Sequence, residues 1–150
     1  ISYVSQNSVL IKDTIKNNII YSRQDEKFDQ KLFNEVLEKT ELINLTNSLP
    51  QKIDSQLGEL GSKISGGQKQ RICIARALYK QPKFIIFDEA TNALDNETEE
   101  KIIQTILSLK KQMTIIIVSH KMNIINKCDK IFEIKNKKIF EIKNKKIFQK

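Results

Sequence analysis

Hydrophobic positions along the chain follow two patterns, one typical of strands and one typical of helices. Continuous apolar runs at 83–87 and 113–118 predict strands buried on both faces, as in a parallel sheet. Elsewhere apolar residues recur every three to four positions, which predicts amphipathic helices. The remaining expected elements are helices over 29–40, 66–79 and 96–109, strands at 1–4 and 130–134, and short helices at 14–21 and 121–126.

The order of these elements predicts an α/β fold. Strand, helix, strand, helix and strand alternate over 83–134, and this alternation indicates a parallel sheet with crossovers. The helical stretch 14–80 interrupts the pattern, so we interpret it as a helical subdomain inserted into a core made of 1–13 and 81–138. A separate tail, 139–150, follows the core.

Local signals place the helix starts and one long loop. Asp29 is expected to cap the helix at 29–40. Asn96 and Glu99 have the spacing of a capping box for the helix at 96–109, and Asp95 could also cap that helix. A proline and two glycines punctuate 44–63, which we expect to be a loop.

The tail contains a tandem repeat. The sequence IFEIKNKK at 131–138 recurs unchanged at 139–146. We interpret it as a local duplication, in which the first copy forms the last strand and its turn. The second copy is either a hairpin partner or a frayed extension. From Lys135 onward seven lysines and one glutamate carry +6 of the net charge of +8, so the basic charge is that of a solvated tail and we expect no nucleic-acid partner.

Composition bounds the class of protein. The chain has 150 residues, 39% of them hydrophobic, which suffices for one domain with a real core. Its apolar runs are strand-sized, far below the ~20 residues needed to span a membrane. Cys73 and Cys128 show no metal or CxxC spacing, so we expect two reduced thiols, as in a cytoplasmic compartment. The chain begins within an expected strand, which suggests a piece of a longer protein.

Two apolar strands end in residues that can do chemistry. FIIFDEA delivers Asp88 and Glu89, and TIIIVSH delivers His120, the only histidine. Ligands of open α/β sheets bind at the carboxyl ends of strands, so we expect all three side chains at one edge. There Asp88 could hold Mg²⁺, Glu89 could polarise a water, and His120 could contact a phosphate and orient that water. The plainer alternative is two solvated acids and a surface histidine.

A third stretch, KISGGQKQR, combines a helix start with two glycines. Ser65 and Gln68 have capping-box spacing, so an ordinary helix start is one explanation. That explanation leaves Gly66 and Gly67 unexplained, because glycine in a helix costs about 1 kcal/mol relative to alanine. A helix start with free N–H groups, a hydroxyl and no Cβ suits close approach by a phosphate. Yet the sequence has no GxxxxGK[ST], the usual phosphate loop.

The motifs together resemble the nucleotide-binding domain of ATP-binding cassette (ABC) transporters, in both order and spacing. In that family the signature loop crosses a head-to-tail dimer and caps the γ-phosphate held by the partner's Walker A loop. The matching motifs are the Q-loop glutamine (Gln6), the signature ISGGQ (Ser65, Gly66, Gly67, Gln68), Walker B with the catalytic glutamate (Asp88, Glu89), the D-loop NALD (Asp95) and the switch histidine (His120).

The resemblance implies a partial P-loop NTPase domain with a parallel-sheet core and an inserted helical subdomain. It implies ATP and Mg²⁺ as cofactors, a second nucleotide-binding domain as partner, and a Walker A loop upstream of Ile1. Without that loop the chain alone should be inert. The implied roles are catalysis by Glu89, His120 and Gln6, Mg²⁺ binding by Asp88 and Gln6, and nucleotide binding across the dimer by Ser65, Gly66, Gly67, Gln68 and Asp95.

The segment before the signature narrows the subtype. SQLGELGSKISGGQ at 55–68, with Glu59 as its acid, resembles the TEVGERG segment of exporters of the lipid-linked oligosaccharide flippase and multidrug/lipid kind. This implies a transmembrane domain, fused upstream, and a place on the cytoplasmic face of a membrane. The sequence departs from the family at Ile64, where leucine is usual, and at Asn92, where serine is usual. Neither departure removes a catalytic group.

Two other readings stay open. One is a soluble cassette ATPase of the DNA-repair or translation type, which the basic tail favours nominally. The other is an inactive truncated remnant, which the missing phosphate loop and the duplicated tail both suit. The cargo is not readable from these residues, because specificity would lie in a membrane domain.

Overall fold

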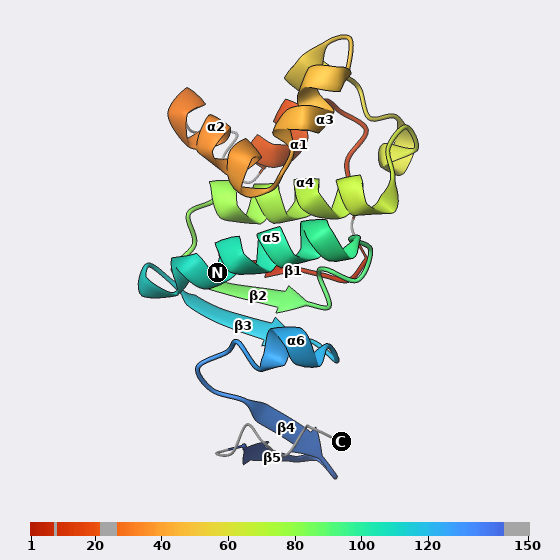
Figure 1. The fold of residues 1–150 in the computed structure, drawn as a ribbon. Helices are drawn as coiled ribbons and strands as arrows, with labels where there is room; N and C mark the ends of the chain where they lie inside the picture. Colours follow the sequence, from red (N-terminus) through yellow and green to blue (C-terminus); the bar gives the residue numbers. More distant parts are fainter. Residues whose placement is uncertain (8, 22–26, 143–150) are drawn as a thin grey trace.

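A three-stranded parallel sheet forms the centre of the chain. The computed structural model describes residues 1–7, 9–21 and 27–142. The sheet has the order β1 (Ser2–Val4), β2 (Phe84–Asp88), β3 (Thr114–Val118), and β2 pairs with both neighbours (Figure 1). Opposite residues include Val4 and Phe87 on one side of β2, and Asp88 and Val118 on the other. The predicted α/β core with a parallel sheet is therefore confirmed.

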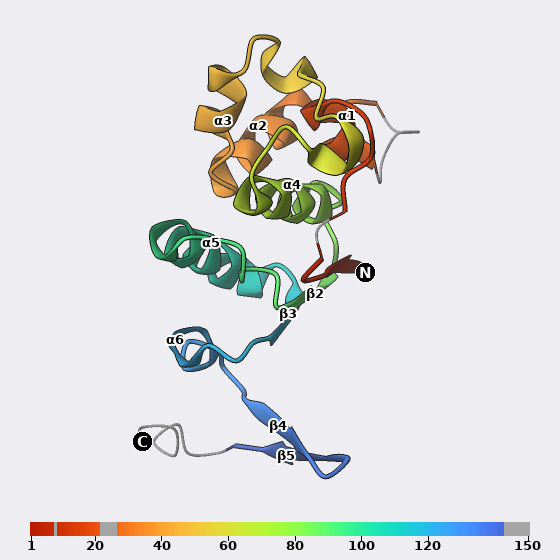
Figure 2. The same ribbon diagram turned by 90° about the vertical axis from the view of Figure 1, so that its right-hand side faces the viewer.

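The last expected strand does not join this sheet. Strand β4 (Phe132–Lys135) pairs antiparallel with β5 (Lys138–Glu141), and Figures 1 and 2 show this hairpin apart from the parallel sheet. Asn136 and Lys137 both have positive φ, 51° and 61°, which is the geometry of a two-residue hairpin turn. The repeat places a second apolar segment directly after the first, so β4 pairs with this neighbouring segment and not with the parallel sheet. The hairpin alternative thus holds for 138–141, whereas 143–150 lie outside the described residues.

Between β1 and β2 the described residues form four α-helices. They are α1 (Ile15–Ile20), α2 (Gln30–Lys39), α3 (Ile43–Ser48) and α4 (Gly66–Tyr79). Asp29 caps α2 as predicted, by accepting a hydrogen bond from the Leu32 N–H. The prediction that 44–63 is a loop was wrong in part, because α3 and two 3₁₀ turns (Lys52–Asp54 and Glu59–Gly61) lie there. Such short elements bury too few apolar residues to leave a periodic pattern.

Helix α5 (Asn96–Ser108) joins β2 to β3 and covers the sheet. Its buried Ile102, Ile103 and Ile106 belong to one core cluster with Ile85 and Phe87 of β2. The predicted capping box at Asn96 and Glu99 was wrong. Asp95 is the N-cap instead. It lies three residues before Thr98, so its carboxylate can accept a hydrogen bond from the Thr98 N–H, at 2.9 Å.

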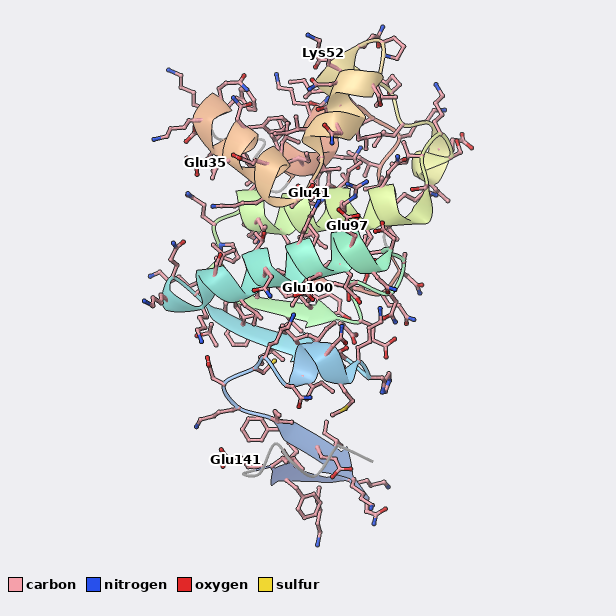
Figure 3. All side chains as sticks on the ribbon, viewed as in Figure 1. Glu35, Glu41, Lys52, Glu97, Glu100 and Glu141 are labelled. Carbon is pink, nitrogen blue, oxygen red and sulfur yellow. The ribbon has the colours of Figure 1, made fainter. Side chains whose placement is uncertain are left out.

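Glu99 ties α5 to Lys121, the residue that precedes α6 (Met122–Ile125). The buried Glu99 carboxylate lies 2.7 Å from Lys121 Nζ, and its own side chain is only 5% exposed. Glu97 and Glu100, by contrast, lie on the exposed side of α5, where Figure 3 labels them. The ion pair at Glu99 therefore anchors the segment that follows β3 to the first turns of α5.

The two faces of the sheet differ in exposure. Ser2, Val4, Ile85 and Phe87 are buried on the face that meets the helices. On the opposite face Tyr3, Ile116 and Val118 are 57%, 44% and 46% exposed. The prediction that 113–118 is buried on both faces was therefore wrong, because the described residues place their helices against one face only.

Candidate functional site

The carboxyl ends of β2 and β3 bring two of the predicted site residues into contact. Glu89 follows the last residue of β2, and its N–H donates to the Val118 carbonyl of β3 at 3.0 Å. Its Oε1 lies 2.7 Å from His120 Nε2. The expected meeting of these two strand ends is thus confirmed, since the parallel pairing sets Asp88 opposite Val118.

Glu89 is held in an uncommon way. Its φ is +48°, a left-handed conformation that is rare for a residue with a side chain. Its side chain is 18% exposed, whereas that of His120 is 90% exposed. Oε2 accepts a second hydrogen bond, from the side-chain amide of Asn92 at 2.9 Å. The carboxylate is therefore oriented on both sides and still reaches solvent, as a base that activates water must.

Asp88 ends β2 beside Glu89 and is tied to the neighbouring strand. The Tyr3 hydroxyl of β1 donates to its Oδ2 at 2.6 Å. The Asp88 carboxylate raises the pKa of Tyr3, first through this hydrogen bond. The Asp88 carboxylate keeps a second oxygen, which suits Mg²⁺, because that ion uses one or two carboxylates and completes its shell with water and phosphate oxygens. Among the residues described, no cluster of three or more His, Cys, Asp or Glu side chains surrounds a metal position.

Gln6 lies two residues beyond β1, at the same edge of the sheet. It is exposed, and the structure gives no hydrogen bond from its side chain to Asp88 or Glu89. The structure therefore places Gln6 at the predicted edge without joining it to the acids.

The helix start at Ser65 has the predicted capping box. Ser65 Oγ accepts from the Gln68 N–H at 3.2 Å, and Gln68 Oε1 accepts from the Ser65 N–H at 2.9 Å. Ser65 and Gly66 are exposed at the tip. Gly67 packs tightly against the 92–95 segment, because a Cβ there would lie 2.9 Å from the Ala93 carbonyl oxygen. The close approach that Gly67 allows is thus made by the chain's own 92–95 segment.

A buried glutamine fastens the same two segments together. Gln70 of α4 is fully buried, and its Oε1 accepts from the Ala93 N–H at 3.0 Å. Asp95, at the end of that segment, is exposed. Its pKa is lowered, mainly because the backbone N–H and the hydroxyl of Thr98 donate to its carboxylate. Helix α4, which begins at the ISGGQ motif (the signature helix), therefore packs against the NALD segment at 92–95.

Sequence reasoning missed three of these residues. Tyr3 and Asn92 contact the two acids, and Gln70 links the helix start to the 92–95 segment. Alternation along β1 and β2 puts Tyr3 and Asp88 on the same face of the sheet, but the register sets Tyr3 opposite Ile86. No sequence signal points from Asn92 to Glu89, because that contact depends on the left-handed turn at Glu89.

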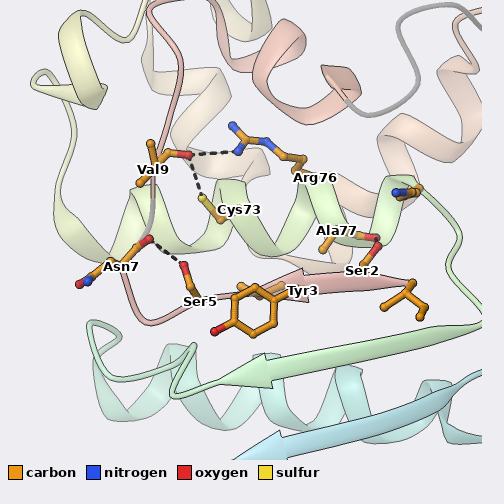
Figure 4. Close-up of a pocket in the computed structure, with 11 residues that line it drawn as sticks. Ser2, Tyr3, Ser5, Asn7, Val9, Cys73, Arg76 and Ala77 are labelled. Carbon is orange, nitrogen blue, oxygen red and sulfur yellow. Dashed lines mark hydrogen bonds between the residues drawn. The ribbon is translucent and has the colours of Figure 1, made fainter.

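One hollow lies away from the two acids and the histidine. It has a volume of about 290 Å³ and lies between β1 and α4, where Figure 4 shows Val9, Cys73 and Arg76 among its lining residues. The Val9 carbonyl accepts from Arg76 Nη1 at 3.0 Å and is approached by Cys73 Sγ at 3.7 Å. None of the predicted site residues lines this hollow, so it carries no part of the chemistry described above.

Comparison with known proteins decides the family. The family model described as ABC transporter matches residues 1–92, more than half of the chain. This chain belongs to the ABC transporter family. The ATP-dependent lipid A-core flippase of Ralstonia nicotianae is 37% identical over 91% of the chain, and that of Pseudoalteromonas translucida is 41% identical over 89%. A putative export ATP-binding/permease protein of Rickettsia bellii is 35% identical over 89% of the chain.

A solved structure agrees in fold. A bacterial Atm1-family ABC exporter with ATP bound superimposes with a TM-score of 0.81 and 37% identity over 87% of the chain. The chain spans 23% of that exporter and of the two flippases. In the described part of this ABC chain, no helix is both long and apolar enough to cross a membrane.

Proposed function

We propose that these residues form the C-terminal part of an ABC exporter's ATP-hydrolysing domain. The contact between Glu89 and His120, next to Asp88 at the ends of two parallel strands, is the observation that carries the proposal. Hydrolysis of a phosphoanhydride requires a base for water, an acid that holds the metal and a group that senses the terminal phosphate. Three neighbouring side chains at one sheet edge match those three requirements.

In this proposal each group has one task. Glu89 accepts a proton from the attacking water, and His120 orients Glu89 and reaches toward the γ-phosphate. Asp88 would hold Mg²⁺, with Gln6 as a further ligand. Bound Mg²⁺ would neutralise charge on the phosphate oxygens. The exposure of His120 supports its task, because a buried imidazole would have no access to a ligand.

The helix start at Ser65 serves a second nucleotide in this account. Its exposed hydroxyl and the N–H groups of Gly66 and Gly67 would cap the γ-phosphate of ATP held by a partner domain. The sequence has no GxxxxGK[ST], so the phosphates need a loop from outside these residues. The exposed apolar face of the sheet, at Tyr3, Ile116 and Val118, is a surface on which such a segment can pack.

Export across a membrane is the proposed use of the hydrolysis. The similarity to lipid A-core flippases and to an export ATP-binding/permease protein supports a fused transmembrane domain and a lipid-like or amphipathic cargo. The domain would then lie on the cytoplasmic face of that membrane. Pairing with a second nucleotide-binding domain follows from the composite site.

The test uses the protein encoded by the complete reading frame that contains these residues. We expect Glu89→Gln to lower the rate of Mg·ATP hydrolysis by a factor of 10² or more, since a general base contributes roughly 10²–10⁴. Nucleotide binding should survive. Glu97→Gln is the matched control, because that carboxylate is 81% exposed on the outer side of α5. A Glu89→Gln protein that hydrolyses ATP at the wild-type rate would remove the proposed base.

A further inference from the structure

The Glu89 carboxylate has two contacts, and the proposed hydrolysis accounts for only one of them. His120 Nε2, beyond the end of the neighbouring strand β3, lies 2.7 Å from Oε1. The Asn92 amide donates to Oε2 at 2.9 Å from the segment that follows β2. Asn92 is itself exposed, so this hydrogen bond is not required to satisfy a buried amide.

The backbone around Asn92 is fixed from both sides. The Asn92 N–H donates to the Glu89 carbonyl at 3.2 Å, which closes a turn beginning at the left-handed Glu89. The next N–H, that of Ala93, donates to the buried Gln70 Oε1 at 3.0 Å. The amide of Asn92 is therefore presented to Glu89 by a rigid support on α4, and its contact with Oε2 follows from the main chain.

We propose that Asn92 is a positioning residue for the proposed base Glu89. The terminal torsion of a glutamate is broad, so an unrestrained carboxylate turns away from its target. A donor on each oxygen fixes the carboxylate plane. Two carboxylate oxygens offer about four acceptor directions, so both contacts leave room for a water. This inference rests on the proposed ATP hydrolysis.

The length of the side chain at position 92 decides whether it can reach the Glu89 carboxylate. A serine at 92, as in the usual SALD sequence, would end its hydroxyl about where asparagine has its Cγ, one bond short of the donor that meets Oε2. Asn92→Ser therefore removes the contact while keeping a small polar residue at an exposed site. Asn96→Ser is the matched control, since Asn96 is an exposed asparagine at the start of α5.

The test measures kcat and KM for ATP in the complete protein. We expect Asn92→Ser and Asn92→Ala to lower kcat about tenfold, because small displacements of a catalytic group cost up to about 10²-fold. KM and the thermal unfolding midpoint should not change, and Asn96→Ser should match wild type. In a Glu89→Gln background, Asn92→Ser should change the residual rate no further, because its effect passes through the carboxylate.

The outcomes separate a failure of the proposed function from a failure of this inference alone. If wild type does not hydrolyse ATP, the proposed function fails and this inference fails with it. If wild type is active and Asn92→Ser keeps a normal kcat, only the inference is overturned. A higher kcat would also overturn it, since Asn92 would then restrain Glu89 rather than position it. An equal loss in the Glu89→Gln background would show that Asn92 acts elsewhere.

Discussion

Gly67 offers a direct test of the packing between the signature helix and the 92–95 segment. A Cβ at position 67 would lie 2.9 Å from the Ala93 carbonyl oxygen, which is backbone and cannot rotate away. Overpacking of this kind costs about 1–3 kcal/mol, whereas alanine gains up to about 1 kcal/mol of helix propensity over glycine. We expect Gly67→Ala to lower the free energy of unfolding by about 1–2 kcal/mol.

Gly66 is the matched control, one residue earlier on the same helix. A Cβ there would meet the Ala93 Cβ at 3.9 Å, an ordinary van der Waals contact. We expect Gly66→Ala to leave the free energy of unfolding unchanged or to raise it by up to about 1 kcal/mol, because alanine gains helix propensity there without a clash. Urea unfolding followed by circular dichroism measures both variants, because the chain has no tryptophan to report by fluorescence. Equal stabilities for the two variants would refute the reasoning.

Two further substitutions test electrostatic contacts. Glu99→Ala should lower the free energy of unfolding by about 2 kcal/mol, because it leaves Lys121 without the buried carboxylate that binds it. Glu100→Ala, at the more exposed ion pair with Lys127, should lower it far less. Comparable losses in urea unfolding would contradict this ranking. Asp95 has a lowered pKa when folded, so its contribution is present above the unfolded value of 3.8 and is lost as pH falls below it. The stability difference between wild type and Asp95→Asn should therefore shrink progressively as pH falls below 3.8. A difference independent of pH would show that the Asp95 charge contributes nothing.

The strength of a local pattern decided how well the sequence predicted each element. Helix α4 matches its predicted bounds of 66–79 because Ser65 and Gln68 mark its start unambiguously. The sheet edge with Glu89 and His120 was predictable, since two continuous apolar strands of a parallel sheet must end together. The strand at 130–134 was assigned to the wrong sheet, because a duplicated neighbour offered it a hairpin at short range.

The finer parts of the site could not be read from the sequence. Apolar residues at 114–118 predict burial, but their exposure depends on which faces the rest of the protein covers. The contact between Asn92 and Glu89 depends on a φ of +48° at a glutamate, which no residue preference predicts. Residue types thus predicted the acids and the histidine, whereas the turn that orients them came only from the structure.

The central claim is that Glu89 of one domain and the helix start at Ser65 of its partner complete a single ATP site. Hydrolysis by mixed dimers of the complete protein tests it, with Glu89→Gln as one lesion and Ser65→Asp as the other. Aspartate keeps the helix cap but repels phosphate. With the lesions on separate subunits, one intact site remains and hydrolysis should persist. With both on one subunit opposite wild type, neither site is intact and hydrolysis should be lost; the reverse result would contradict the account.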